Sequence, residues 1–234
     1  MGKAITVRSA ADSAILQPDL EDGIAVTFTY GEQPDTVLEN FVIVNSSIAV
    51  FAENSSPSLK HLTIVNNENG LQAYESSAPV VEHCIFWNNS QNDIYIFNPL
   101  APEVTFSCIQ RPRTGVGNIS SDPLFVNSDP AAMDFHLKSQ YGRYLPDGSS
   151  AQRPKPENWI SDDQTSPCID AGRPDINPFC ETMCNGGRIN IGAYGNTPFA
   201  SKSPWTLKAD MDYNGQVDIK DVILFSSQWL STTF

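Results

Sequence analysis

The sequence predicts an all-β protein, a parallel β-helix in which short strands stack along an axis in coils of about 22 residues. Two observations predict this fold. Apolar, strand-like segments recur at a nearly constant spacing through the first half of the chain, and Asn, Ser, Gly and Pro turn residues separate them. No single repeat of this length could bury its own apolar face, whereas stacked repeats could.

Two strand patterns make up the repeat. Residues 38–45 (LENFVIVN) match residues 59–66 (LKHLTIVN) at an offset of 21, and these match residues 81–88 (VEHCIFWN) at an offset of 22. The second pattern recurs every 23 residues, in segments 48–51, 71–74 and 94–97. Leucine-rich repeats have a similar length, but their Leu-rich frame with a helical half is missing. We therefore expect two strands per coil and about five or six coils.

Asparagines end the first pattern in three successive coils, at Asn45, Asn66 and Asn88. Stacked at the strand spacing of roughly 4.8 Å, their amides could hydrogen-bond from coil to coil. Three ordinary turn asparagines are the alternative.

The first pattern is apolar on both faces, as in a strand that is covered on both sides. Its second set of alternating residues is Val42, Val44, Thr63, Val65, Ile85 and Trp87. We expect the irregular, Pro-rich chain after Arg111 to fold back over this face. Trp159 and Trp205 are then either lids on that packing or additional platforms for sugars.

Composition and charge exclude several classes of protein. The 234 residues include 14 Lys and Arg against 27 Asp and Glu, a net charge of −13, which is unsuited to binding nucleic acid. No apolar run reaches the roughly 18 residues of a membrane span, so no membrane partner is expected. The start of the chain has no apolar signal region, which leaves a cytoplasmic protein or a module excised from a secreted one as alternatives.

Four features together carry a family resemblance: the segment KAITVRS at 3–9, the coils, SPCIDAG at 166–172 and GGRINIGAYG at 186–195. Over about residues 3–200 the chain resembles the right-handed parallel β-helix proteins of secreted bacterial carbohydrate systems. The resemblance implies that the last two motifs form a structural end-piece of the helix. This group includes polysaccharide lyases, glycoside hydrolases and non-catalytic sugar-binding modules, among them modules attached to xylanases, so the fold does not decide the activity.

The tail has the spacing of a calcium-binding loop, D-x-D-x-N-G-x-x-D. The predicted calcium ligands are Asp210, Asp212, Asn214, the backbone carbonyl of Gln216, Asp218 and Asp221. Gly215 falls where the chain must turn around the ion, and an apolar segment from Val222 is expected to form a short helix. The segment resembles half of a dockerin, with one loop where a dockerin has two, which puts docking to a cohesin in doubt.

Strand alternation predicts an aromatic strip on the outside of the second pattern. Gln72 should avoid the core, so Tyr74, two residues on, should also face outward, and the same alternation places Phe51, Tyr95 and Phe97 outward on neighbouring coils. The predicted sugar-binding residues are Phe51, Gln72, Tyr74, Glu75, Tyr95 and Phe97, with Glu53 and Asn98 nearby. An exposed aromatic cluster with a polar rim is typical of recognition surfaces. Rings that fill the interior are the alternative, since one bulge would reverse the alternation.

The sequence offers little for catalysis. Lys60 is the only cation between Arg8 and Arg111, against 13 acidic residues, which disfavours a polyanionic substrate. Glu53 and Glu75 could face each other as a carboxylate pair, or be surface acids. His61 and His83, 22 residues apart, could stack, but no third metal ligand recurs with them. Among the five cysteines, a local disulfide involving Cys168, Cys180 and Cys184 is one expectation, with Cys84 and Cys108 as buried apolar residues.

These observations predict a β-helix domain with an irregular end segment at 1–200, and a linker with the calcium loop and helix at 201–234. The expected function is non-catalytic binding of a plant cell-wall polysaccharide, first of all xylan-type hemicellulose. The expected setting is a secreted enzyme with a tethered catalytic domain. A polysaccharide lyase or glycoside hydrolase is the alternative, and a structural scaffold that docks through its tail is a third possibility.

Overall fold

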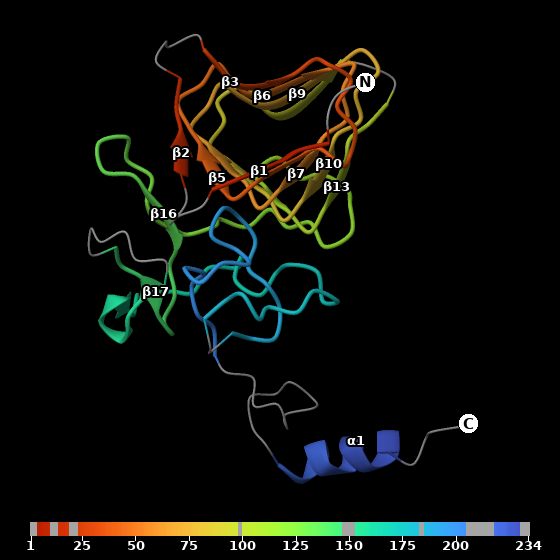
Figure 1. Cartoon of the computed structure of the whole chain (residues 1–234). Helices are drawn as coiled ribbons and strands as arrows, with labels where there is room; N and C mark the ends of the chain where they lie inside the picture. Colours follow the sequence, from red (N-terminus) through yellow and green to blue (C-terminus); the bar gives the residue numbers. More distant parts are fainter. Residues whose placement is uncertain are drawn as a thin grey trace.

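In the computed structural model the chain forms a parallel β-solenoid of about four turns with about 23 residues per turn (Figure 1). The structure describes residues 4–9, 14–18, 23–97, 100–146, 153–182, 185–204 and 218–229. It confirms the predicted all-β solenoid, but with about four turns instead of five or six. The count is lower because the chain leaves the repeat soon after residue 109 and takes an irregular course.

Each full turn contributes one strand to each of three parallel sheets in the described chain (Figure 1). Sheet A consists of β1 (Thr6–Arg8), β4 (Val37–Glu39), β7 (Ser58–Lys60), β10 (Val80–Glu82) and β13 (Glu103–Thr105). Sheet B consists of β2 (Ala14–Leu16), β5 (Phe41–Ile43), β8 (Thr63–Val65), β11 (Ile85–Trp87) and β14 (Cys108–Ile109). Sheet C consists of β3 (Ile24–Phe28), β6 (Ile48–Glu53), β9 (Asn69–Tyr74) and β12 (Asn92–Phe97).

The prediction of two strands per coil was wrong, because the first sequence pattern contains two strands that belong to different sheets. The chain bends between sheets A and B at residues in the left-handed region: Asn40, His61, His83 and Phe106, with φ between 45° and 60°. Asn and His are enriched at positive φ whereas Phe is not, and three different residue types make the same bend, so the bend has no common sequence signature.

The interior of the solenoid is filled by one apolar cluster with contributions from all three sheets. Its largest fully buried members include Ile43, Leu59, Ile64, Leu71 and Phe86. Stacking equivalent residues of successive coils produces this core, which explains why the repeat is visible in the sequence at all.

A ladder of amides inside the corner between sheets B and C stabilises the turns. The Asn67 amide donates to the carbonyl oxygens of Ile43 and Val65 and to Asn89 Oδ1, at 3.0–3.1 Å, and Asn67 Oδ1 accepts the N–H of Ser46 at 3.0 Å. The predicted asparagines lie one residue earlier, on the outside. There Asn88 donates to Asn66 Oδ1 at 2.6 Å. The predicted contact between outer asparagines of successive coils is therefore present. The buried ladder, however, is formed by the asparagines that follow them, Asn67 and Asn89.

The chain from Arg111 to Pro204, here called the covering segment, packs on the outer face of sheet B, as predicted. It contains β15 (Phe125–Asn127), β16 (Asp134–Leu137), β17 (Arg143–Tyr144), the 3-10 helix η1 (Pro156–Asn158) and β18 (Trp159–Ile160). Two apolar clusters join it to the solenoid. One brings Leu137, Cys168 and Ile191 against Ile85 and Cys108, and the other joins Val42, Val44, Val65, Phe135 and Ala193.

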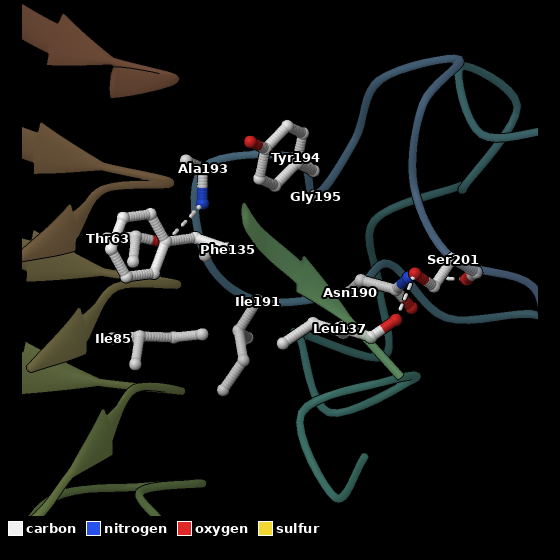
Figure 2. A pocket seen from close by; sticks show the side chains of 11 residues that line it. Thr63, Ile85, Phe135, Leu137, Asn190, Ile191, Ala193, Tyr194, Gly195 and Ser201 are labelled. Atoms are coloured by element: carbon white, nitrogen blue, oxygen red, sulfur yellow. Dashed lines mark hydrogen bonds between the residues drawn. The ribbon is translucent and has the colours of Figure 1, made fainter. Parts of the chain in front are cut away.

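Figure 2 shows the contact between the two layers. Ala193 donates its N–H to Thr63 Oγ1 at 3.0 Å, and the Asn190 amide donates to the Ser201 carbonyl at 2.7 Å. The cavity between these residues measures only about 10 Å³, about the size of one water molecule. The covering segment is therefore closely packed onto sheet B.

The covering segment extends to the residues that the sequence predicted to be a linker. Lys202 donates its backbone N–H to the Gly142 carbonyl at 2.8 Å, and its Nζ lies 3.9 Å from the centre of the Trp159 ring. Ser203 is buried. Trp159 thus belongs to the packing of this segment, while Trp205 lies outside the described residues.

The last element is α1 (Ile219–Trp229), the helix that the apolar segment after the calcium-loop pattern predicted. Asp218 and Asp221 cap its first turn. Asp218 Oδ1 accepts the N–H of Lys220, and Asp221 Oδ2 accepts the N–H of Asp218, both at 2.7 Å. This reciprocal arrangement satisfies backbone donors at a helix start.

Candidate functional site

An aromatic strip, defined as Phe51, Tyr74, Tyr95 and Phe97, crosses the outer face of sheet C on three successive coils. The residues between them, including Val50, Ala52, Leu71 and Ala73, are buried in the core. Phe97 is 65% exposed and Tyr95 37%, whereas Phe51 and Tyr74 are half-buried. The strand alternation is thus the one that the position of Gln72 predicted, and the rings lie outside the solenoid.

Tyr74 is the centre of the strip. Its ring centroid lies 5.5 Å from that of Phe51, 6.1 Å from Tyr95 and 5.4 Å from Phe97. The register explains this. Tyr74 pairs directly with Phe97, while Phe51 and Tyr95 flank Gln72, two residues before Tyr74 on the same face. The planes are tilted by 37–47°, so the strip is a staggered row of ring faces and edges.

Polar side chains border the strip. Gln72 lies between Phe51 and Tyr95 in the register, and its amide makes no hydrogen bond to any other described residue. Glu53 pairs with Tyr74, and Glu75 is exposed at the turn after β9, with φ 52°. Asn98 lies outside the described residues. Amide and carboxylate groups beside exposed rings are suited to hydroxyl-bearing ligands.

Glu53 and Glu75 are not register partners, so the strand register does not support a carboxylate pair. The partner of Glu53 is Tyr74, and Glu75 falls one position further along the coil, where the backbone turns. Nothing in the strand register places the two carboxylates across a common substrate position.

His61 and His83 do stack, with ring centroids 4.8 Å apart, but both are buried beneath the covering segment. His83 Nε2 accepts the backbone N–H of Arg173 at 3.1 Å. Burial lowers the pKa of His61 to about 3 and that of His83 to about 4. The pair is therefore neutral near pH 7. In the described part of the chain, no group of three or more His, Cys, Asp and Glu side chains is arranged to hold a metal.

A groove of about 520 Å³ lies over the outer face of sheet A. Its charged lining consists of Lys60, Glu82, Glu103, Arg173 and Asp175. Arg173 binds Glu82 at 3.0 Å and Asp175 at 2.7 Å. Arg173 comes from the covering segment, 91 residues from Glu82, and no motif in the sequence connects the two.

A second groove, of about 510 Å³, follows the corner between sheets B and C. It is lined by polar side chains, among them the outer asparagines Asn45, Asn66 and Asn88, together with Glu68. Asn66 is held from the other side, since its amide donates to the carbonyl of Ser128 at 3.0 Å. These asparagines therefore line the groove and also make hydrogen bonds at the coil corners.

Only two of the six predicted calcium ligands fall within the described residues. These are Asp218 and Asp221, whose carboxylates cap α1, while Asp210, Asp212, Asn214 and Gln216 lie outside them. Capping of the following helix is compatible with a calcium loop, in which the last ligands stand at a helix start. The calcium site remains a prediction.

In comparisons with known proteins, neither a family model nor a curated protein nor a solved structure matches this chain. Among the helices of the described residues, none has both the length and the apolar character needed to cross a membrane.

Proposed function

We propose that the protein is a non-catalytic carbohydrate-binding module that holds a plant cell-wall polysaccharide on the aromatic strip. The observation that supports this most directly is the row of four contacting rings on the outer face of sheet C, with Gln72 between two of them. The apolar faces of pyranose rings pack on aromatic rings, and neighbouring amides and carboxylates can bond the hydroxyl groups.

Charge favours a neutral polymer as the ligand. The chain carries a net charge of −13, and Glu53 and Glu75 border the strip. A polyuronate would be repelled by this surface, and no Lys or Arg belongs to β6, β9 or β12. Xylan-type hemicellulose, neutral or sparsely substituted with acidic groups, is our first choice over pectin or alginate.

Native gel electrophoresis with soluble polysaccharide in the gel tests the proposal. Xylan should retard the wild-type protein, whereas pectin should not. Phe97→Ala and Tyr95→Ala should each weaken retardation at least several-fold, and the double variant should abolish it. Phe179→Ala and Tyr141→Ala are matched controls, because these rings are exposed, by 81% and 50%, but belong to the covering segment.

Thermal melting of the same variants separates binding from folding. Phe97 is largely exposed, so its removal should leave the melting temperature nearly unchanged. Unaltered retardation of a folded Tyr95→Ala/Phe97→Ala variant would contradict the proposal. So would a wild-type protein that is retarded by none of xylan, glucomannan and pectin.

A polysaccharide lyase or glycoside hydrolase is the second candidate, and the groove over sheet A favours it. There the covering segment brings Arg173 to the groove that contains Lys60, so cations and carboxylates line one surface. Incubation with xylan or pectin would then release new reducing ends or unsaturated products. Lys60→Met and Glu103→Gln should abolish that release, while Phe97→Ala should only reduce it. If xylan retards the protein in the gel but no products are released, the result supports the binding module.

We further propose that the tail binds calcium and that the module works outside the cell beside a tethered catalytic domain. The D-x-D-x-N-G-x-x-D spacing and the caps of α1 by Asp218 and Asp221 support the calcium site. Calcium should increase the helical circular-dichroism signal of the full chain, and a chelator should reverse it. Asp210→Ala should remove the response, whereas Asp175→Ala, at an exposed acid far from the loop in sequence, should leave it intact. A signal indifferent to calcium would exclude the site.

A further inference from the structure

The groove at the corner between sheets B and C, here called the corner groove, has a polar lining that takes no part in the proposed function. Its volume of about 510 Å³ is within the range of pockets that bind small molecules. Ser128 and Pro130 of the covering segment belong to its lining. Three successive coils of the solenoid contribute the rest, chiefly Asn45, Asn66, Glu68, Asn88 and Ser90.

The backbone alone does not account for the three asparagines of this groove. They have φ between 53° and 57°, in the left-handed region that Asn adopts readily. At the corner between sheets A and B, however, His61, His83 and Phe106 adopt the same conformation. The fold therefore does not require Asn on every coil, and the polar lining of the groove has another cause.

Part of this lining is available to a ligand. Asn66 is engaged, since its amide donates to the Ser128 carbonyl at 3.0 Å and its Oδ1 accepts from Asn88 at 2.6 Å. The side-chain amide of Asn45 and the hydroxyl of Ser90, in contrast, make no hydrogen bond to any other described residue. Within the described chain, the Oδ1 atom of Asn88 accepts none either.

The remaining acceptor of the groove is the carboxylate of Glu68, which is exposed. Its Oε2 accepts from the Ser47 hydroxyl at 3.2 Å and from the Gln91 amide at 3.4 Å. These contacts orient the carboxylate and leave the Oε1 atom without a hydrogen bond among the described residues. The groove thus presents donors and acceptors side by side.

The composition of the lining selects the class of ligand. Its described residues include no Lys, Arg or His, so a phosphate or carboxylate would find no counter-charge. Arg111 lies outside the lining and donates to the carbonyls of Asn89 and Ser90 at 3.0 and 3.3 Å. Glu68 is the one carboxylate, which is few for a divalent cation, and Pro130 is the one apolar residue, which leaves no anchor for a lipid or an apolar peptide side chain. Amides and hydroxyls that both donate and accept match ligand hydroxyl groups, which do the same.

The groove is also rigid, because coil-to-coil hydrogen bonds fix its backbone. Asn45 donates its N–H to the Asn66 carbonyl at 3.2 Å, and Ser90 donates its N–H to the Asn67 carbonyl at 2.8 Å. Polar groups that are already in place reduce the entropy cost of binding. Since successive coils are about 4.8 Å apart, Asn45 and Asn88 are separated by roughly 10 Å along the axis, which is close to the length of a disaccharide.

We propose that the corner groove is a second carbohydrate site, which binds the hydroxyl groups of a neutral oligosaccharide that lies along the solenoid axis. Asn45, Glu68 and Asn88 bond the hydroxyls, and no sugar ring stacks on an aromatic side chain. The inference goes beyond the proposed function and does not depend on it, because the aromatic strip takes no part. Glu68 precedes β9 and Tyr74 ends it, so the two sites are about 20 Å apart along the strand.

Nuclear magnetic resonance of the ¹⁵N-labelled full chain tests this through the side-chain amide signals. Xylohexaose and mannohexaose are the neutral probes, and trigalacturonic acid is the charged one. Asn45→Gly identifies the Asn45 signals by their loss and keeps the positive φ. The amide of Asn190, which is buried and donates to the Ser201 carbonyl, is the internal reference.

At least one neutral hexaose should shift the amide signals of Asn45 and Asn88 in a saturable way, and trigalacturonic acid should not. The shifts should persist in Tyr95→Ala/Phe97→Ala, which removes the exposed rings of the strip. Asn45→Gly/Ser90→Ala should weaken the binding that the Asn88 signal reports by about ten-fold, since two hydrogen bonds are lost. Asn54→Gly is the matched control, because Asn54 is an exposed asparagine with φ 51° outside the groove, and it should leave the affinity unchanged.

Amide signals of Asn45 and Asn88 that shift with neither hexaose would overturn the inference. So would shifts that are as large with trigalacturonic acid, or shifts that disappear in Tyr95→Ala/Phe97→Ala, which would locate the ligand on the strip and leave the proposed function intact. Shifts that persist in a protein whose retardation by xylan does not depend on Tyr95 and Phe97 would support the corner groove and contradict the strip. Melting temperatures of all variants confirm that each is folded.

Discussion

The imidazole rings of His61 and His83 stack at 4.8 Å, at the left-handed corner between sheets A and B, beneath the covering segment. The same corner in the preceding coil is Asn40, whose amide donates to the carbonyls of Ala193 and Gly195 at 3.0 and 3.2 Å. The corner thus anchors the covering segment with neutral polar groups, and its histidines must stay uncharged to remain buried.

Acid should therefore weaken the fold through these histidines. Their pKa values fall from 6.5 to about 3 and about 4 on folding, so the unfolded chain binds more protons between about pH 4 and 6.5. The contribution is fully present above pH 6.5 and is lost as the pH falls through this window, on the order of 3 kcal/mol for His83. The charged and titratable groups around the pair are Lys60, Glu82, Arg173, Asp175 and Arg188.

Urea unfolding at several pH values measures this effect. His61→Asn/His83→Asn adopts the residue type that Asn40 has at this corner, and Asn accepts positive φ readily. The variant should lose the part of the pH dependence that lies between pH 4 and 6.5. An unchanged slope would show that the histidines are accessible to protons in the folded protein.

Glu181 should act in the opposite direction. Burial raises the pKa of this carboxyl to about 8, although its Oε1 accepts the N–H groups of Asn190 and Asn196 at 2.7 and 2.8 Å. The folded state keeps a proton that the unfolded state releases near pH 4.5. Stability from this group is therefore full below pH 4.5 and is lost, by a few kcal/mol, as the pH rises through 8.

Replacement of Glu181 by Gln keeps the acceptor and removes the titration. Glu181→Gln should be more stable than the wild type at pH 8–9, and the two should differ less at pH 5. Glu157→Gln, at an exposed position, is the control and should change neither value by more than about 0.5 kcal/mol. Lower stability of Glu181→Gln at pH 9 would show that the carboxylate form is preferred.

The buried amide ladder should be costly to interrupt. Asn67→Ala removes four hydrogen bonds of one side chain and leaves the carbonyls of Ile43 and Val65 without that donor, which should cost about 2–4 kcal/mol. Asn45→Gly, at the outer corner with φ 53°, preserves the turn and should cost well under half as much. If chemical unfolding showed that the two variants lose similar amounts of unfolding free energy, the stabilising role of the Asn67 ladder would be contradicted.

Gly192 should be required for the covering segment to lie close to sheet B. Its φ is 93°, and an added Cβ would lie 2.7 Å from Ile85 Cδ1 and 3.0 Å from Thr63 Oγ1. Gly192→Ala should therefore cost about 2–4 kcal/mol, from backbone strain together with overpacking. Gly142 also has a positive φ, 124°, but an added Cβ would lie 3.4 Å from its nearest neighbour. Gly142→Ala should therefore lose only the stability that corresponds to backbone strain. Equal melting temperatures for both variants would argue against tight packing.

The solenoid could be predicted because each coil repeats its buried residues. Leu59, Ile64 and Leu71 occupy positions that recur in the neighbouring coils, and stacking requires that recurrence. The side of Tyr74 could be predicted from Gln72, since the alternation of a strand fixes both together. The third sheet could not, because Asn40, His61 and His83 perform the same bend with different side chains.

The individual contacts of the covering segment could not be predicted from the sequence either. Arg173 binds Glu82, and Cys168 lies in the same apolar cluster as Cys108, but the covering segment has no repeat and therefore no register from which these partners could be predicted. The general location of the covering segment could be predicted from the apolar outer face of sheet B. Which residues it contacts there depends on its irregular turns. The outward position of the rings on sheet C was predicted, whereas the groove over sheet A was not.

The covering segment also changes how the solenoid is expected to unfold. In a simple repeat array each unit touches only its neighbours, so the ends can fray independently. Here one irregular stretch touches the coils of Asn40, Thr63, Ile85 and Cys108 at once. Unfolding of any one coil therefore removes contacts that hold the covering segment on the other coils. The coils that this segment contacts are expected to unfold together as one cooperative unit.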